Sequence, residues 1–173
     1  MSDAVQPKSI QPKDFINNLL ILLTETVEGA PKLPTAYLDA KASFFHTFQD
    51  ISAEQASTPV TSDGMTIAAH VEHSRFYMEV LLGYMNGCTD KVDWDKSWQL
   101  KTVSADDWQT LKADFETVYQ NIKIHVQNVE TWGDIEVGDA MAIVVHSAYH
   151  LGAVRQMMKL LNERDDTIVN INS

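Results

Sequence analysis

Apolar residues recur every three to four positions along four long stretches of the chain, which is the spacing of helices with one buried face. The four stretches are residues 13–28, 65–84, 104–129 and 139–162. Pro12 suits the first turn of the first helix. No comparable alternating pattern indicates a strand. The pattern therefore predicts an all-α fold, built as a four-helix bundle.

Between the first two long helices, residues 35–51 predict an extra short helix whose aromatic side chains we interpret as core or interface packing. Ser52 and Gln55 have capping-box spacing and predict one more helical turn. Ser62 or Asp63 is then expected to cap the second long helix. These elements precede the second long helix as elaborations of the bundle.

Residues 88–103 form a long connection that carries Trp94 and Trp98. Long connections within compact domains are often functional. The next long helix is expected to begin at the capping box of Ser104 and Asp107.

The same pattern divides the chain into a flexible arm at residues 1–11, a bundle domain at 12–163 and a polar tail at 164–173. The last helix is expected to end near Asn162, and the only faint strand signal lies in the tail at residues 168–171.

Composition and charge limit the function classes. A chain of 173 residues suits one domain with a substantial core. The net charge of −11 argues against binding to nucleic acid or an anionic membrane surface, because both need a basic face. The polar N-terminus is no secretory signal, and Cys88 has no partner for an internal disulfide. We therefore expect a cytoplasmic protein.

The candidate chemistry lies in the histidines. His146 and His150 are four residues apart on the apolar face of the last long helix, and His70 lies in the middle of the inward face of the second. Burying neighbouring imidazoles without partners is costly. Three imidazoles with an open fourth position make a catalytic-type site for zinc or a neighbouring divalent metal. We therefore predict His70, His146 and His150 as metal ligands.

Three further side chains are candidates for the surroundings of this site. His73 falls at the edge of the inward face, either as a boundary residue, as support for the ligands or as an alternative ligand. Tyr77 shares the inward face and could line a pocket. Trp98 could wall the pocket or could simply cover the core.

Three segments together resemble the DinB-like (DNA-damage-inducible) superfamily, and the resemblance covers roughly residues 11–162. The segments are Ile67-Ala-Ala-His-Val-Glu-His-Ser-Arg-Phe76, Asp95-Lys-Ser-Trp98 and His146-Ser-Ala-Tyr-His-Leu-Gly-Ala-Val-Arg-Gln156. The resemblance implies a four-helix bundle, often dimeric, with a three-histidine site for nickel or zinc. Mapped by motif, its ligands are again His70, His146 and His150. Iron and manganese are alternatives for the metal.

Characterised members of the superfamily include transferases and isomerases that use low-molecular-weight thiols. The segment 35–51 and the tryptophan-containing connection depart from those members, so the substrate does not carry over. The leading hypothesis is a metal-dependent transferase or hydrolase that activates water or a thiol cosubstrate. A homodimer is expected from the resemblance alone. One alternative is a non-catalytic helical module with buried or pH-sensitive histidines. Another is a small-molecule-binding bundle in which a metal only anchors the ligand.

Overall fold

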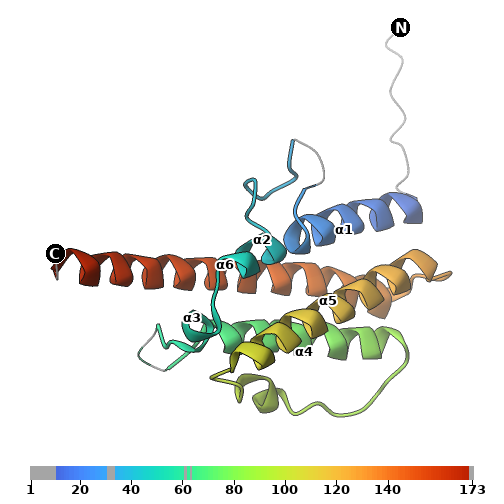
Figure 1. Cartoon of the computed structure of the whole chain (residues 1–173). Helices are drawn as coiled ribbons and strands as arrows, with labels where there is room; N and C mark the ends of the chain where they lie inside the picture. Colours follow the sequence, from blue (N-terminus) through green and yellow to red (C-terminus); the bar gives the residue numbers. More distant parts are fainter. Residues whose placement is uncertain (1–10, 31–33, 61, 63, 172–173) are drawn as a thin grey trace, which may run out of the picture.

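The computed structural model describes residues 11–30, 34–60, 62 and 64–171, and all the regular secondary structure in these residues is helical (Figure 1). The elements are α1 (Pro12–Val27), α2 (Phe44–Gln49), α3 (Ala53–Ser57), α4 (Ile67–Met85), the 3-10 helix η1 (Trp94–Trp98), α5 (Ala105–Asn128) and α6 (Asp134–Ile171). The all-α prediction is confirmed for this part of the chain. None of its helices combines the length and the apolar character that a membrane span requires.

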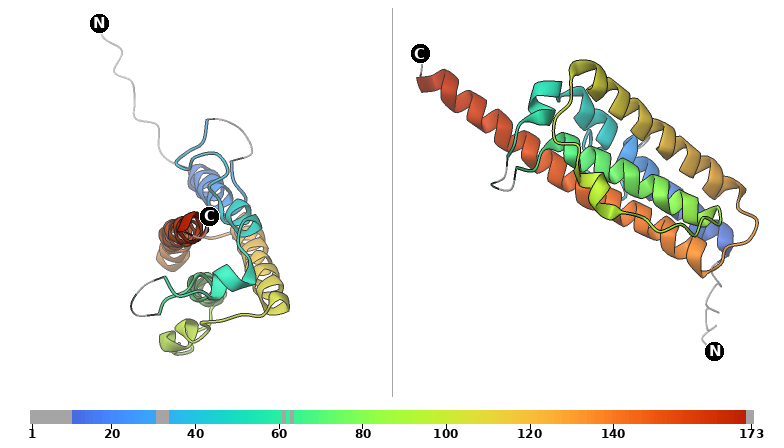
Figure 2. Two further views of the ribbon diagram at one scale, coloured as in Figure 1. Left: turned by 60° about the vertical axis from the view of Figure 1, so that its left-hand side comes forward. Right: turned by 90° about the horizontal axis from the view of Figure 1, so that it is seen from below.

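Four long helices enclose the core. α4 contacts both α5 and α6, and α1 contacts the same two helices from the opposite side. The view along the helices shows this arrangement, with η1 lying outside α4 (Figure 2). The end of α6 projects beyond the other helices (Figures 1 and 2). The helical pair α4 and α6 carries the site described below.

The local capping signals set several helix ends. Ser104 and Asp107 form the expected capping box at the start of α5, and Ser52 and Gln55 form the one at the start of α3. The expected cap of α4 is wrong, because Thr66 accepts the hydrogen bond from the Ala69 amide. Asp63 lies outside the described residues, and so does nearly all of the predicted arm at 1–11.

The predicted helix at 35–51 is only partly helical. Its second half contains α2, whereas the residues before it are irregular. The Glu25 carboxylate, which is 2% exposed, accepts hydrogen bonds from the backbone amides of Ala36, Tyr37 and Leu38. These amides are satisfied by a side chain of α1, so the segment needs no helical hydrogen bonds there.

The aromatic side chains of this segment do pack in the core, as expected. Phe44 and Phe48 contact Phe115 at ring-centroid distances of 4.8 and 5.5 Å. Trp108 contacts Phe48 and donates a hydrogen bond from Nε1 to the Ile51 carbonyl at 3.0 Å. The short helices before α4 are therefore anchored on α5.

The last helix is longer than the sequence pattern predicted. α6 runs to Ile171 rather than ending near Asn162, and the stretch with the faint strand signal is helical. The apolar repeat ends near Leu161, but Glu163 and Arg164 continue the helix because no glycine or proline follows to stop it.

Candidate metal centre

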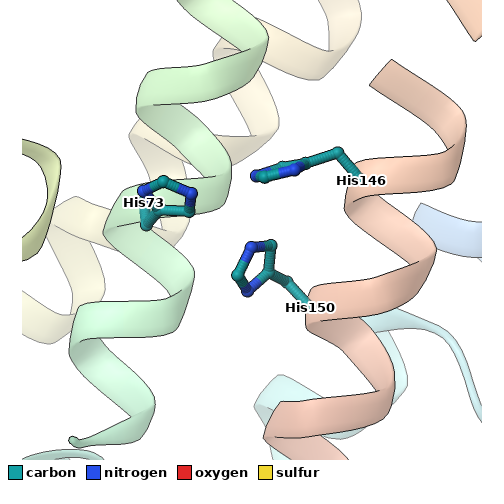
Figure 3. A group of neighbouring side chains, drawn as sticks. All are labelled: His73, His146 and His150. Carbon is teal, nitrogen blue, oxygen red and sulfur yellow. The ribbon is translucent and has the colours of Figure 1, made fainter. Parts of the chain in front are cut away.

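Four imidazoles meet where α4 packs against α6. His70 and His73 come from α4, and His146 and His150 come from α6. Residues three or four apart lie on the same side of a helix, so each pair faces the opposite helix. The ligand nitrogens of His73, His146 and His150 all lie within 4.8 Å of one another. Figure 3 shows these three rings turned toward a common space, with a ring nitrogen of each pointing into it.

His70 lies beside this group. Its Nδ1 atom is 2.9 Å from Nδ1 of His150, and the two ring centroids are 5.1 Å apart. The sequence predicts His70 as the third ligand, and His73 as a boundary residue, a support for the ligands or an alternative ligand. In the structure, His73 rather than His70 completes the close group of three, while His70 forms a hydrogen bond with one of its members.

His73 is also more buried than the apolar pattern suggested. It is 7% exposed, whereas His70, placed by that pattern at the centre of the inward face, is half-buried. The connection between α4 and α5 adds to the burial of His73, because Trp98 of η1 stacks on its ring and Ser97 of η1 is hydrogen-bonded to its Nδ1. The expectation that His73 lies at the edge of the buried face is therefore wrong.

The predicted neighbours Trp98 and Tyr77 both contact the group. Trp98 stacks on His73 with ring centroids 3.9 Å apart and an angle of 15° between the rings. Tyr77 stacks on His146 at 3.6 Å and 14°. Each aromatic ring restricts the orientation of one imidazole. The long connection thus builds one wall of the site, through Trp98.

Ser97 is a further neighbour of the histidine group that the sequence pattern does not predict. Its side chain is fully buried, and its Oγ atom lies 2.7 Å from Nδ1 of His73. The only signal in the sequence was its position next to Trp98 in the segment Asp95-Lys-Ser-Trp98. A serine in a polar connection carries no periodic signal that distinguishes it from a surface residue.

The surroundings of the imidazoles favour their neutral forms. Burial, followed by the neighbouring His73, lowers the pKa of His146 to about 4. Burial, followed by the other three histidines, lowers the pKa of His150 to about 3. Burial and the proximity of His70 also lower the pKa of His73. Metal binding requires neutral imidazoles, so all three side chains are in the ligand form at neutral pH.

The ring nitrogens that are left without a hydrogen bond indicate whether a metal ion fits this group. Nε2 of His146 is buried and has no hydrogen-bond partner among the described residues. Nδ1 of His73 and Nδ1 of His150 take part in hydrogen bonds, so Nε2 is the remaining ring nitrogen of each. Three neutral nitrogen donors converging on one space fit the preferences of zinc and related divalent ions. The group could therefore hold a metal ion.

Comparisons with protein-family models, with curated proteins and with solved structures find no match for this chain. The resemblance to the DinB-like superfamily therefore remains a hypothesis that rests on the three short sequence segments alone.

Proposed function

We propose that the protein is a divalent-metal-dependent enzyme, related to the DinB-like superfamily and of the transferase or hydrolase type. The observation that carries this proposal is the convergence of His73, His146 and His150, whose ligand nitrogens lie within 4.8 Å of one another. Zinc and nickel are the metals that we propose for this donor set. The remaining coordination position would be open to a small molecule.

A divalent ion with an open coordination position activates a bound water molecule or thiol for nucleophilic attack. The contribution of the chain is to hold three neutral donors in place. Tyr77 and Trp98 fix two of the rings by stacking, and His70 contacts the third by its hydrogen bond to His150. The substrate would be a small molecule, with a low-molecular-weight thiol as cosubstrate.

Histidines that merely fill the core are the competing explanation, and the stacks on Tyr77 and Trp98 are compatible with it. The buried Nε2 of His146 argues against it. Leaving a buried polar atom unsatisfied costs about 1–3 kcal/mol. The stack on Tyr77 leaves this nitrogen unpaired, whereas a metal ion would satisfy it directly.

Metal content tests the proposal. Untagged protein is purified without chelator, incubated with zinc or nickel, freed of unbound metal and assayed by elemental analysis. We expect about one equivalent of metal in the parent protein, as for a mononuclear site. The double variant His146→Ala/His150→Ala should fold but retain no metal.

His46→Gln provides a matched control, because His46 is in α2 and its Nδ1 is hydrogen-bonded to Ser43 at 2.8 Å. This variant should bind as much metal as the parent. A parent protein that takes up neither ion would overturn the metalloenzyme proposal and favour the non-catalytic helical module. Metal bound by the parent and lost in the double variant would justify a screen of thiol-transfer and hydrolytic reactions.

A further inference from the structure

Ser97 connects the backbone of η1 to the imidazole of His73. Its Oγ atom donates a hydrogen bond to the Trp94 carbonyl at 2.6 Å and lies 2.7 Å from Nδ1 of His73. A serine hydroxyl has one hydrogen and two acceptor lone pairs. Since that hydrogen points to the Trp94 carbonyl, Oγ can only accept from His73.

We infer that Ser97 fixes the tautomer of His73 with the proton on Nδ1, which makes Nε2 the ring nitrogen available to a metal ion. This inference rests on the proposed function for the role of the metal. The tautomer itself follows from the hydrogen bonds alone. In the opposite tautomer, the Ser97 hydroxyl would have to turn from the Trp94 carbonyl to Nδ1 of His73, which would leave the carbonyl and the Ser97 oxygen 2.6 Å apart without a hydrogen between them.

The fold of η1 holds Ser97 in this role. Residues three apart are closest in a 3-10 helix, so the side chain of Ser97 reaches the carbonyl of Trp94 in the preceding turn. The ring of Trp94 packs on Phe76 and Tyr77 of α4, with ring centroids 6.0 and 5.6 Å away. The carbonyl that accepts the hydrogen bond from Ser97 is thereby anchored to the helix that carries His73.

The consequence for the site is that Ser97 acts as a positioning residue. Metal-binding histidines usually donate their second N–H to a fixed acceptor, and loss of that acceptor typically weakens metal binding about 10–100-fold. Here the acceptor comes from the connection between α4 and α5 rather than from the helices that carry the ligands.

Two measurements on Ser97→Ala test this inference. Long-range proton–nitrogen NMR correlations in the metal-free protein report which nitrogen of His73 carries the proton. Competition with a chelator reports the affinity for zinc. We expect the parent to carry the proton on Nδ1, the variant to lose this preference, and its zinc affinity to fall about 10–100-fold.

Two further variants separate the loss of the hydrogen bond to His73 from the general effect of removing a buried hydroxyl. Ser97→Thr keeps the hydroxyl and should preserve the parent tautomer. Ser74→Ala removes another fully buried hydroxyl, which donates to the His70 carbonyl and contacts no imidazole nitrogen in the described hydrogen bonds. It should leave the tautomer of His73 and the zinc affinity unchanged.

A proton on Nε2 of His73 in the parent would overturn the inference without any variant. An unchanged tautomer in Ser97→Ala, or a changed tautomer with unchanged zinc affinity, would overturn it as well. If the parent binds no metal but Ser97→Ala shifts the tautomer, the proposed function fails and the control of the tautomer by Ser97 stands.

Discussion

The Nδ1 atoms of His70 and His150 lie 2.9 Å apart, so one imidazole donates a hydrogen bond to the other. If His150 binds a metal through Nε2, its Nδ1 carries a proton and donates to His70. Ligand histidines are commonly oriented by such a hydrogen bond. His70 would then support a ligand, and His73 would be the ligand that α4 provides.

Alanine variants of these two residues distinguish the roles. His73→Ala should abolish stoichiometric zinc binding because it removes a ligand. His70→Ala should weaken binding about 10–100-fold while preserving the stoichiometry. Competition with a chelator measures both effects. The reverse order of severity would identify His70 as the ligand, as the DinB-like resemblance implies.

The ambiguity between His70 and His73 shows what the sequence could and could not predict. The apolar repeat correctly predicted that α4 and α6 carry histidines on buried faces. Two residues three positions apart differ by about 60° around a helix, so both fit a broad apolar face. The burial of His73 depends in part on Ser97 and Trp98 of η1, and no periodic pattern in this connection predicts where it packs.

Two capping boxes that depend on local sequence signals were predicted correctly, whereas a segment that depends on long-range contacts was not. The caps at Ser52 and Ser104 were predictable because each involves residues only three positions apart. The irregular segment before α2 was not predictable, because its amides bind Glu25, more than ten residues earlier. Long-range partners of this kind leave no periodic pattern in the sequence.

Tyr77 should stabilise the fold through its stack on His146. Its ring lies 3.6 Å from the imidazole at an angle of 14°. Tyr77→Phe keeps the stacked face, and its free energy of unfolding should stay within about 0.5 kcal/mol of the parent. Tyr77→Ala removes the ring and should cost about 1–3 kcal/mol, measured by urea unfolding. Equal costs for the two variants would show that the stack contributes nothing.

The histidines should make the stability of the metal-free protein depend on pH. The folded protein lowers the pKa of His146 from 6.5 to about 4, and that of His150 from 6.5 to about 3. Between these values and 6.5 the unfolded chain binds more protons, so acidification favours unfolding. The free energy of unfolding should therefore fall as the pH drops from about 6.5 toward 4, by up to about 1.4 kcal/mol per pH unit for each histidine.

Urea unfolding at about pH 7, 6 and 5 measures this dependence. His150→Gln should show a shallower slope, because glutamine is neutral in both the folded and the unfolded state. The same slope in the variant and the parent would show that His150 is not the source of the pH dependence.

Glu25 should be required for the conformation of the segment before α2. Burial alone would raise the pKa of this carboxyl, but the backbone amides of Leu38, Tyr37 and Ala36 outweigh burial and lower it. Their hydrogen bonds are 2.6, 2.7 and 2.6 Å long. Glu25→Gln replaces one acceptor oxygen by an NH₂ group that faces an amide donor. It should cost about 1.5–3 kcal/mol, the range for hydrogen bonds to a charged group.

Amide hydrogen exchange measures the effect at the segment itself. The backbone amides of Ala36, Tyr37 and Leu38 should exchange faster in Glu25→Gln than in the parent. Glu28→Gln, at the C-terminal cap of the same helix, is the matched control. Glu28 pairs with Lys123 at 2.7 Å, but it is partly exposed, so its pairing should contribute less than about 1 kcal/mol. If Glu25→Gln left the exchange of the three amides unchanged, the segment would be held by its aromatic packing on α5 instead of by the carboxylate.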